Sequence, residues 1–570
     1  MRKLGKAALF AVAALAAVAA VGFYVVRSLR QPPESRIFLN GTVLTMDAHD
    51  SIAQAVALAR DRIVAVGTNE EVQRLVAKGS IVVDLHGQTM LPGFIDAHGH
   101  FPGSGLAAIA VDLNSPPIGA IKDIPAAIAA LQAKARATRR GRWVVGYGYD
   151  DMALAEGRHF TRADLDRVSV DHPVYAWHIS GHTAVVNSVA LKLLGITATT
   201  PDPPGGVIHK DPATHEPTGR LEETAHHAAM KQTLALSFLE GVKAARYATA
   251  EYAAAGVTTA QVGLADEKMF TAVSRLSTLG LISQRLIVWP DAALGERIVA
   301  GALDPGDFNS DGFHVGAVKL VADGSIYIYT AYLSEPYTTP YRGDAGYRAY
   351  PTHSRDELTK LVSKFHTAGL QVAIHGNGDA AIDDIIVAIA AAQQASPRPD
   401  ARHLIVHAQT ARLDQLDAMK ALGISPTYHN PHVFYFADRH WDVFLGPGRT
   451  ARISPLKSTL DRGVRFSIHT DTPVLPISPL MAVWCAVQRR SAAGRLIGPA
   501  ERIAPMAALR AVTIDAAWQV FQEDNRGSIE KGKYADLVIL SDNPVAHPDA
   551  IREMKVLETI TGGRTIYAMR

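Results

Sequence analysis

The sequence predicts an α/β fold built around a (β/α)8 TIM-like barrel, with a β-sandwich domain formed by both ends of the chain and a transmembrane segment at the N-terminus. Three observations predict it. Short apolar strands alternate with Ala-rich helical stretches in the middle of the chain, both ends have the pattern of β-strands, and a long uncharged stretch lies near the start. At 570 residues the chain is too long for one core, so we expect at least two structural units.

The N-terminal segment is expected to lie outside the folded body. Residues 7–26 are uncharged, mostly Ala, Val and Leu, and follow three basic residues. As a helix this stretch would span roughly 30 Å, the thickness of a membrane hydrocarbon core. We therefore expect residues 1–35 to be either a membrane anchor or a cleaved signal segment. Both options predict a membrane-anchored or exported protein with a periplasmic or extracytoplasmic body, and an inward-facing tether is the alternative.

Both ends of the remaining chain are predicted to form the β-sandwich domain, in residues 36–90 and 505–570. Short runs rich in β-branched residues are separated there by Gly and Asp turns, a pattern typical of short strands. The predicted strands are 37–45, 53–66, 81–85, 534–540, 555–560 and 564–568.

Residues 91–504 are predicted to form the barrel. Eight apolar strands occur there, at 91–97, 256–262, 285–289, 314–321, 370–375, 403–408, 423–428 and 464–469. Helical stretches lie at 124–136, 241–255, 356–368, 380–394 and 411–422. Alternating strands and helices predict a parallel sheet, and eight units favour a closed barrel. Periodicity does not exclude an open doubly wound sheet, but no Gly-rich dinucleotide fingerprint follows any strand.

An insertion interrupts this pattern after the first barrel strand. The gap before the second strand is too long for one βα connection, so residues 103–235 are expected to form an inserted cap subdomain. It leaves the barrel at the carboxyl ends of the strands, where barrel active sites are built. We therefore expect the cap to cover the functional site.

The charge and the cysteine and histidine content of the chain limit the partners and metal sites that we expect. A net charge of +2 gives no electrostatic argument for nucleic acid as a partner. The single cysteine, Cys485, excludes an internal disulfide and a thiolate metal cage. With 23 histidines, any bound metal would be held by nitrogen and oxygen.

Polar residues follow five of the predicted strands. In "DAHGH" (96–100), His98 and His100 are two residues apart, which puts both imidazoles on one face of a strand. The complete set of candidate metal ligands is His98, His100, Lys319, His375, His407 and Asp471. A lone histidine at a strand end is usually a hydrogen-bonded structural residue. Six such residues on one barrel rim favour a site for divalent metal.

Several motifs support a family resemblance. The segments "LPGFIDAHGH", "VKLVADG", "IHGNGDAA", "IVHAQ", "HTDTPV" and "GSIEKGKYADLVILSDNP" resemble those of the amidohydrolase superfamily of metal-dependent hydrolases. The chain is most similar to the branch that includes N-substituted formamide deformylase and the YtcJ-like proteins. It departs from that pattern in "GNGD" and in His469, which stands where a small residue is usual.

The resemblance implies a site with two divalent ions, for which Zn²⁺ is expected. His98, His100 and Asp471 would hold the more buried ion, and His375 and His407 the more exposed one. Carboxylated Lys319 would bridge them, since an ammonium has no lone pair for a cation. The implied function is hydrolysis of a non-peptide carbon–nitrogen bond, of the amide or N-formyl type, in a small molecule. A metal-activated hydroxide would attack, with Asp471 as the catalytic residue that moves the proton.

Substrate contacts are less clearly indicated. The candidates are His182, Tyr149, Tyr327 and His432, and ordinary core packing is the alternative for each tyrosine. His469 either lines the pocket or packs. Asp323 and Asp379 are expected to fix loops or ligands in place.

Two other functions stay open. The same site would suit an ester or lactone, and a catalytically silent membrane-tethered binding protein is the third hypothesis. The expected partners are a small-molecule substrate, the membrane through residues 7–26, and a second copy of the chain in a homodimer.

Overall fold

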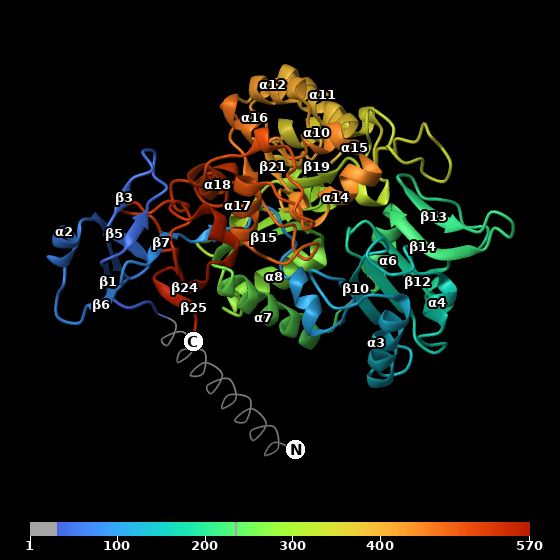
Figure 1. Ribbon diagram of the computed structural model, residues 1–570, viewed down its shortest axis with the longest axis horizontal. Coiled ribbons are helices and arrows are strands. Elements are labelled where there is room, and N and C mark those ends of the chain that lie inside the picture. Colours follow the sequence, from blue (N-terminus) through green and yellow to red (C-terminus); the bar gives the residue numbers. More distant parts are fainter. Residues whose placement is uncertain (1–30, 234–235) are drawn as a thin grey trace, which may run out of the picture.

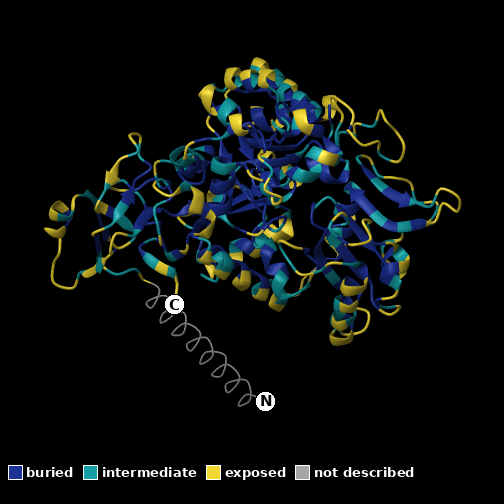
Figure 2. Ribbon diagram, in the orientation of Figure 1, coloured by how far each residue is buried: buried dark blue, intermediate teal, exposed yellow. Residues whose placement is uncertain are grey.

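The computed structural model describes residues 31–233 and 236–570 (Figure 1). Strands from the two ends of the chain lie together at one side of the molecule, a body of parallel strands and helices occupies the middle, and the inserted residues lie at the other side. The fold is mixed α/β. Buried residues fill the interior of all three parts, and exposed residues concentrate on the outer helices and loops (Figure 2).

The central strands run parallel and follow one another in chain order. They are β8 (Phe94–Ile95), β15 (Val257–Ala265), β16 (Arg285–Pro290), β17 (Phe313–Val315), β18 (Val318–Val321), β19 (Val372–Gly376), β20 (Leu404–His407), β21 (Ser425–Tyr428) and β22 (Ser467–Ile468). They form two parallel sheets, in the orders β17-β16-β15-β8 and β18-β19-β20-β21-β22, and only Gly316 and Ala317 separate β17 from β18 along the chain. Past the first and last strands, His100 N–H donates to Thr472 O at 2.8 Å and Asp471 N–H to His98 O at 3.3 Å. Residues that follow β8 are thus hydrogen-bonded to residues that follow β22.

Helices cover the outside of these strands. Among them are α7 (Phe238–Ala254), α10 (Arg355–Thr367), α11 (Asp379–Ala395) and α12 (Leu413–Leu422). The start of α10 shows why these boundaries follow from sequence: the Ser354 side chain accepts from Glu357 N–H, and the Glu357 side chain accepts from Ser354 N–H. Leu358, Val362 and Phe365 then recur at helical spacing and are buried in the central core.

The chain ends form two sheets. One has the order β5-β4-β1-β6 and the other β25-β24-β23-β7-β2-β3. Their bounds are β1 (Ser35–Leu39), β2 (Thr42–Leu44), β3 (Ile52–Ala53), β4 (Ala55–Ala59), β5 (Arg62–Gly67), β6 (Ile81–Asp84), β7 (Thr89–Pro92), β23 (Leu537–Leu540), β24 (Val556–Thr561) and β25 (Arg564–Ala568). Phe38 and Val56 from the first sheet share a core with Met90, Leu537 and Ile560 from the second. This shared core joins the two ends of the chain.

The insertion forms a six-stranded sheet of its own, in the order β13-β14-β12-β11-β10-β9. Its elements are β9 (Val111–Asp112), α3 (Ile124–Ala137), β10 (Val144–Tyr149), α4 (Arg162–Asp166), β11 (Val174–His178), β12 (Thr183–Val186), α5 (Ser188–Leu194), β13 (Gly206–Lys210), β14 (Pro217–Glu223) and α6 (Thr224–Thr233). Leu131, Tyr149 and Val185 belong to one of its two apolar cores. We call residues 103–235 the cap.

The predicted fold class needs one correction. It included a membrane-spanning helix, but no helix within residues 31–233 and 236–570 is both long and apolar enough to cross a bilayer. The described residues form a mixed α/β fold. The stretch 7–26, on which the prediction rested, lies outside the described residues. Neither the predicted membrane attachment nor the predicted homodimer gains support from the described part of the chain.

Candidate metal centre

The residues that follow β8 and β22 meet in the interior. His98 Nε2 lies 3.4 Å from Asp471 Oδ1, and His100 Nε2 lies 3.3 Å from the same oxygen. His98 is buried, whereas more than a third of the His100 side chain is exposed. The two imidazoles and the carboxylate therefore converge on one point, as the spacing in "DAHGH" predicts.

Histidines from β19 and β20 complete the arrangement. His407 Nε2 lies 3.0 Å from His375 Nδ1, and its Nδ1 lies 3.2 Å from Nε2 of His469. Nitrogen or oxygen atoms of His98, His407 and Asp471 all lie within 4.8 Å of one another, and the same is true of His407, His429 and His469. His469 therefore lies against the cluster.

Lys319 extends from β18 into the same cluster. Its Nζ lies 3.3 Å from His98 Nε2 and 5.7 Å from the centre of the Trp289 ring. Burial lowers the pKa of the amine to about 7, and Asp471 opposes this only in part. Near neutral pH a large fraction of the amine is thus uncharged and nucleophilic.

The electrostatics favour a cation. Burial lowers the pKa of His98 and of His407 far below the usual value, so both rings are neutral and keep a lone pair. Burial alone would raise the pKa of Asp471, but His100, His407 and His98 hold it well below its usual range. The centre therefore combines neutral imidazoles with one ionised carboxylate.

A buried carboxylate oxygen that meets two imidazoles only at poor hydrogen-bond geometry tests whether these residues suit a metal. Asp471 Oδ1 is fully buried and makes no hydrogen bond of good geometry with any described residue. Leaving such an atom unsatisfied is costly unless something else binds it. The donor set of imidazole nitrogens and a carboxylate is one that Zn²⁺ and similar ions prefer. The residues fit a divalent metal.

Neighbouring residues hold the ligands in place. His98 Nδ1 lies 3.0 Å from Gln261 Oε1 on β15, which directs the other ring nitrogen toward the cluster. Trp289 stacks on the His98 ring at 5.3 Å between ring centres. A Cβ on Gly263 would lie 2.5 Å from His98 Cε1, so only glycine permits this approach. Gln261 and Gly263 were not among the residues predicted from the sequence. A glutamine inside an apolar strand nevertheless indicates a buried polar contact of the kind that Gln261 makes with His98.

Two of the candidate ligands have backbone conformations that most residues avoid. His407 has φ of 74° and Asp471 has φ of 55°, in the left-handed region. Such conformations cost of order 1–3 kcal/mol each and concentrate at functional sites. The strained backbone therefore occurs at two residues whose side chains point into the cluster.

The predicted substrate residues divide into two groups. The His182 ring lies 4.9 Å from that of His375, and its Nδ1 lies 2.8 Å from Glu223 Oε2. Tyr327 stacks on Phe436 at 4.3 Å and lies edge-on to His432 at 5.5 Å. The His432 ring also packs on that of His429, and the His429 ring in turn neighbours that of His407.

Tyr149 belongs to the other group. It is fully buried in the cap core, where it packs on Phe160 and its hydroxyl lies 3.1 Å from His159 Nδ1. The structure therefore brings His182, Tyr327 and His432 near the histidine cluster and leaves Tyr149 in the packing position that was the alternative for it.

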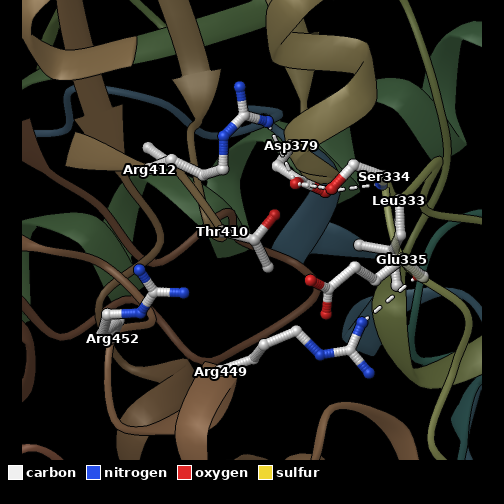
Figure 3. Close-up of a pocket in the computed structure, with 9 residues that line it drawn as sticks. Leu333, Ser334, Glu335, Asp379, Thr410, Arg412, Arg449 and Arg452 are labelled. Atoms are coloured by element: carbon white, nitrogen blue, oxygen red, sulfur yellow. Dashed lines mark hydrogen bonds and ion pairs between the residues drawn. The ribbon is translucent and has the colours of Figure 1, made fainter. Parts of the chain in front are cut away.

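Asp323 and Asp379 hold loops at the strand ends. The carboxylate of Asp323 accepts from the N–H groups of Tyr332, Asn377 and Gly378 at 2.8–3.0 Å. Asp379 accepts from Ser334 N–H at 2.9 Å and from Arg412 Nη1 at 3.1 Å. Both contacts of Asp379 lie at a small cavity of about 60 Å³ (Figure 3). That cavity is lined by arginines and acids and has no imidazole, so it is separate from the histidine cluster.

Comparisons with known proteins agree with this geometry. A family model described as the amidohydrolase family matches residues 81–567. N-substituted formamide deformylase from Arthrobacter pascens is 30% identical over 546 residues, covering 93% of this chain and 98% of that protein. The putative amidohydrolase YtcJ from Bacillus subtilis is 27% identical over 550 residues, covering 93% and 99%. A solved structure, an uncharacterized metal-dependent hydrolase from Pyrococcus furiosus, has 25% sequence identity and a TM-score of 0.70, covering 90% of this chain and 100% of that one. Because the family model covers most of the chain and the site has its donor residues, this protein belongs to the amidohydrolase family.

Proposed function

We propose that this protein is a metal-dependent hydrolase that cleaves a carbon–nitrogen bond, of the amide or N-formyl type, in a small non-peptide molecule. The observation that carries the proposal is the buried convergence of His98, His407 and Asp471, with nitrogen and oxygen atoms within 4.8 Å of one another. Family membership supports hydrolysis in general, and the similarity to a formamide deformylase supports the type of bond. The proposal includes a closed TIM-like barrel in residues 91–504, the sandwich domain in 36–90 and 505–570, and the cap as the cover of the site.

Six residues would hold two divalent ions, with Zn²⁺ expected. His98, His100 and Asp471 would bind one, His375 and His407 the other, and Lys319 would bridge them. When bound, such ions supply a Lewis acid that polarises a carbonyl group and lowers the pKa of water to about 7. Asp471, ionised and within reach of His98 and His100, would accept the proton of the attacking water and pass it to the leaving amine.

Lys319 fits the bridging role only after modification. Its neutral amine can add carbon dioxide and lose one proton, which leaves a carbamate with two oxygens and one negative charge. The depressed pKa of Lys319 favours this reaction near neutral pH because the reactive form is the free amine. The resulting charge would offset that of the ions in a buried site.

The substrate would bind beside the cluster. The rings of Tyr327, Phe436 and His432 pack on one another near the cluster, and the ring of His182 from the cap packs on that of His375. This surface is mostly apolar, which suits a compound with a hydrophobic substituent on nitrogen. His182 is held by Glu223, which raises the pKa of the imidazole against the effect of burial. A protonated His182 would donate a hydrogen bond to a carbonyl group.

A substrate panel tests the proposal. Zn²⁺-loaded enzyme would be incubated with N-formyl amines, other amides, and esters and lactones of matched shape, with chelator-treated enzyme as the baseline. We expect metal-dependent hydrolysis of the carbon–nitrogen compounds, loss of turnover in His98→Ala and unchanged turnover in His215→Gln, an exposed histidine of the cap. Turnover of esters or lactones alone would contradict the proposed bond type. A metal-loaded enzyme inactive on the whole panel would favour a binding protein.

A further inference from the structure

A second set of metal-ligating side chains lies within the cap, apart from the six residues described above. Asp151 follows β10, His159 lies in the loop before α4, and His178 ends β11. His178 Nε2 lies 3.0 Å from Asp151 Oδ1, and His159 Nε2 lies 3.4 Å from Asp151 Oδ2. One ligand atom from each residue can be chosen so that all three lie within 4.8 Å of one another. No residue is shared with the metal centre.

The separations match those of a tetrahedral metal site. With Zn–N and Zn–O bonds of about 2.0–2.1 Å, neighbouring ligand atoms in a tetrahedron lie about 3.3 Å apart. The separations of 3.0 and 3.4 Å are close to this value, although they involve different oxygens of Asp151. Both imidazoles thus lie at ligand spacing from the Asp151 carboxylate, and the three residues come from three different segments of the chain.

The far side of each imidazole is also engaged. His178 Nδ1 lies 2.9 Å from Ser180 Oγ, and His159 Nδ1 lies 3.1 Å from the Tyr149 hydroxyl. The Tyr149 oxygen can accept a hydrogen bond from His159 Nδ1, which leaves the His159 Nε2 lone pair directed at Asp151. The backbone N–H of Ser180 donates to His178 Nδ1 at 3.1 Å, so without metal the proton of His178 lies on Nε2, facing Asp151 Oδ1, and a cation would have to replace that proton. Metal-binding histidines nearly always have such a partner on the second nitrogen. The buried hydroxyl of Tyr149, placed in the cap core, has this role.

Burial and charge are compatible with a cation. The His178 side chain is fully buried, while the side chains of Asp151 and His159 are 16% and 17% exposed. This partial exposure leaves room for water as a fourth ligand. Burial would raise the pKa of Asp151, but His159, His178 and Arg220 keep the carboxylate ionised. The guanidinium of Arg220 opposes a cation, and its contact with Glu222 offsets that charge.

We propose that Asp151, His159 and His178 bind a divalent cation of the Zn²⁺ type, which fastens the 150–160 loop to β11 within the cap. The neighbouring Asp150 makes two 2.7 Å contacts with Nη1 of Arg439 in α14 (Ala437–Arg439) of the barrel. The bound ion therefore stabilises the loop through which the cap contacts the barrel.

Metal counting tests this in a background that lacks the main centre. His98→Ala/His375→Ala protein would be loaded with Zn²⁺, freed of excess by gel filtration and measured for zinc per chain. We expect about one ion to remain. Adding His159→Gln or Asp151→Asn should remove it, whereas adding His215→Gln should not. Circular dichroism would show that each variant is folded.

A second measurement keeps the proposal testable if a variant does not fold. Chelator-treated wild-type protein would be titrated with Zn²⁺ to count its binding sites. The double variant His98→Ala/His375→Ala should lose all of these sites except one. Equal zinc content with and without His159→Gln, in folded protein, would overturn the proposal. The same conclusion would follow if wild type had no site beyond those lost with His98 and His375. The three residues would then be an ion-paired group that holds the loop without metal.

Discussion

Replacing Lys319 by methionine should stabilise the metal-free protein while destroying the proposed bridge. Burial lowers the pKa of the amine from 10.5 to about 7, so folding forces an amine that is protonated in the unfolded chain either to lose its proton or to carry a buried charge. At about 1.4 kcal/mol for each pKa unit, this penalty approaches about 5 kcal/mol below pH 7. Methionine has a similar length and no charge, so its packing cost is small.

The penalty depends on pH in a defined direction. It is complete below the folded-state pKa of about 7, decreases between pH 7 and 10.5, and vanishes above pH 10.5, where the amine is neutral in both states. We therefore expect Lys319→Met to exceed wild type in unfolding free energy by about 4 kcal/mol at pH 7 and by only about 1–2 kcal/mol at pH 9.5.

The assay is denaturant unfolding followed by circular dichroism, in chelator and in buffer purged of carbon dioxide, at both pH values. Lys243→Met, at an exposed position of α7, is the matched control and should change stability by no more than about 0.5 kcal/mol. The reasoning is refuted if Lys319→Met is less stable than wild type at pH 7. It is also refuted if the difference between the two proteins does not shrink at pH 9.5.

Three further predictions concern the metal centre. His98→Ala and His375→Ala should lose different ions, as metal analysis of the purified variants would show; equal loss of both would indicate a single or fully coupled centre. Asp471→Asn should lower kcat by about 10²–10⁴-fold, since it removes the proton carrier, and unchanged turnover would exclude that role. Lys319→Arg should be inactive, whereas Lys319→Ala should regain turnover with added acetate, whose carboxylate can occupy the bridge; normal turnover of Lys319→Arg would argue for a single-metal site.

Much of the local structure could be predicted because it depends on neighbouring residues. The helix expected at 356–368 corresponds to α10 because Ser354 and Glu357 form a capping box and apolar residues recur at helical spacing. The strand expected at 403–408 corresponds to β20, and His407 follows its apolar run. The predicted membrane helix at 7–26 lies outside the described residues, and no helix among those residues is long and apolar enough to cross a membrane.

The arrangement of the site was predictable only in part. The six proposed ligands could be named because parallel strands bring their carboxyl ends to the same rim. Gln261 could not be paired with His98, since 163 residues separate them and no local pattern relates the two. The sequence does not show whether His469 lines the pocket or packs, and only the fold places its ring beside that of His407.

The sequence by itself determined the order of strands and helices, the residue types available to a metal and the family to which they belong, because periodicity, capping and motif spacing are properties of nearby residues. Only the tertiary structure decided which rings face one another, which carboxylates stay ionised, and that Asp151, His159 and His178 meet in the cap. Distances between remote residues, and the burial that shifts their pKa values, arise from packing of the whole chain, and short stretches of sequence do not encode them separately.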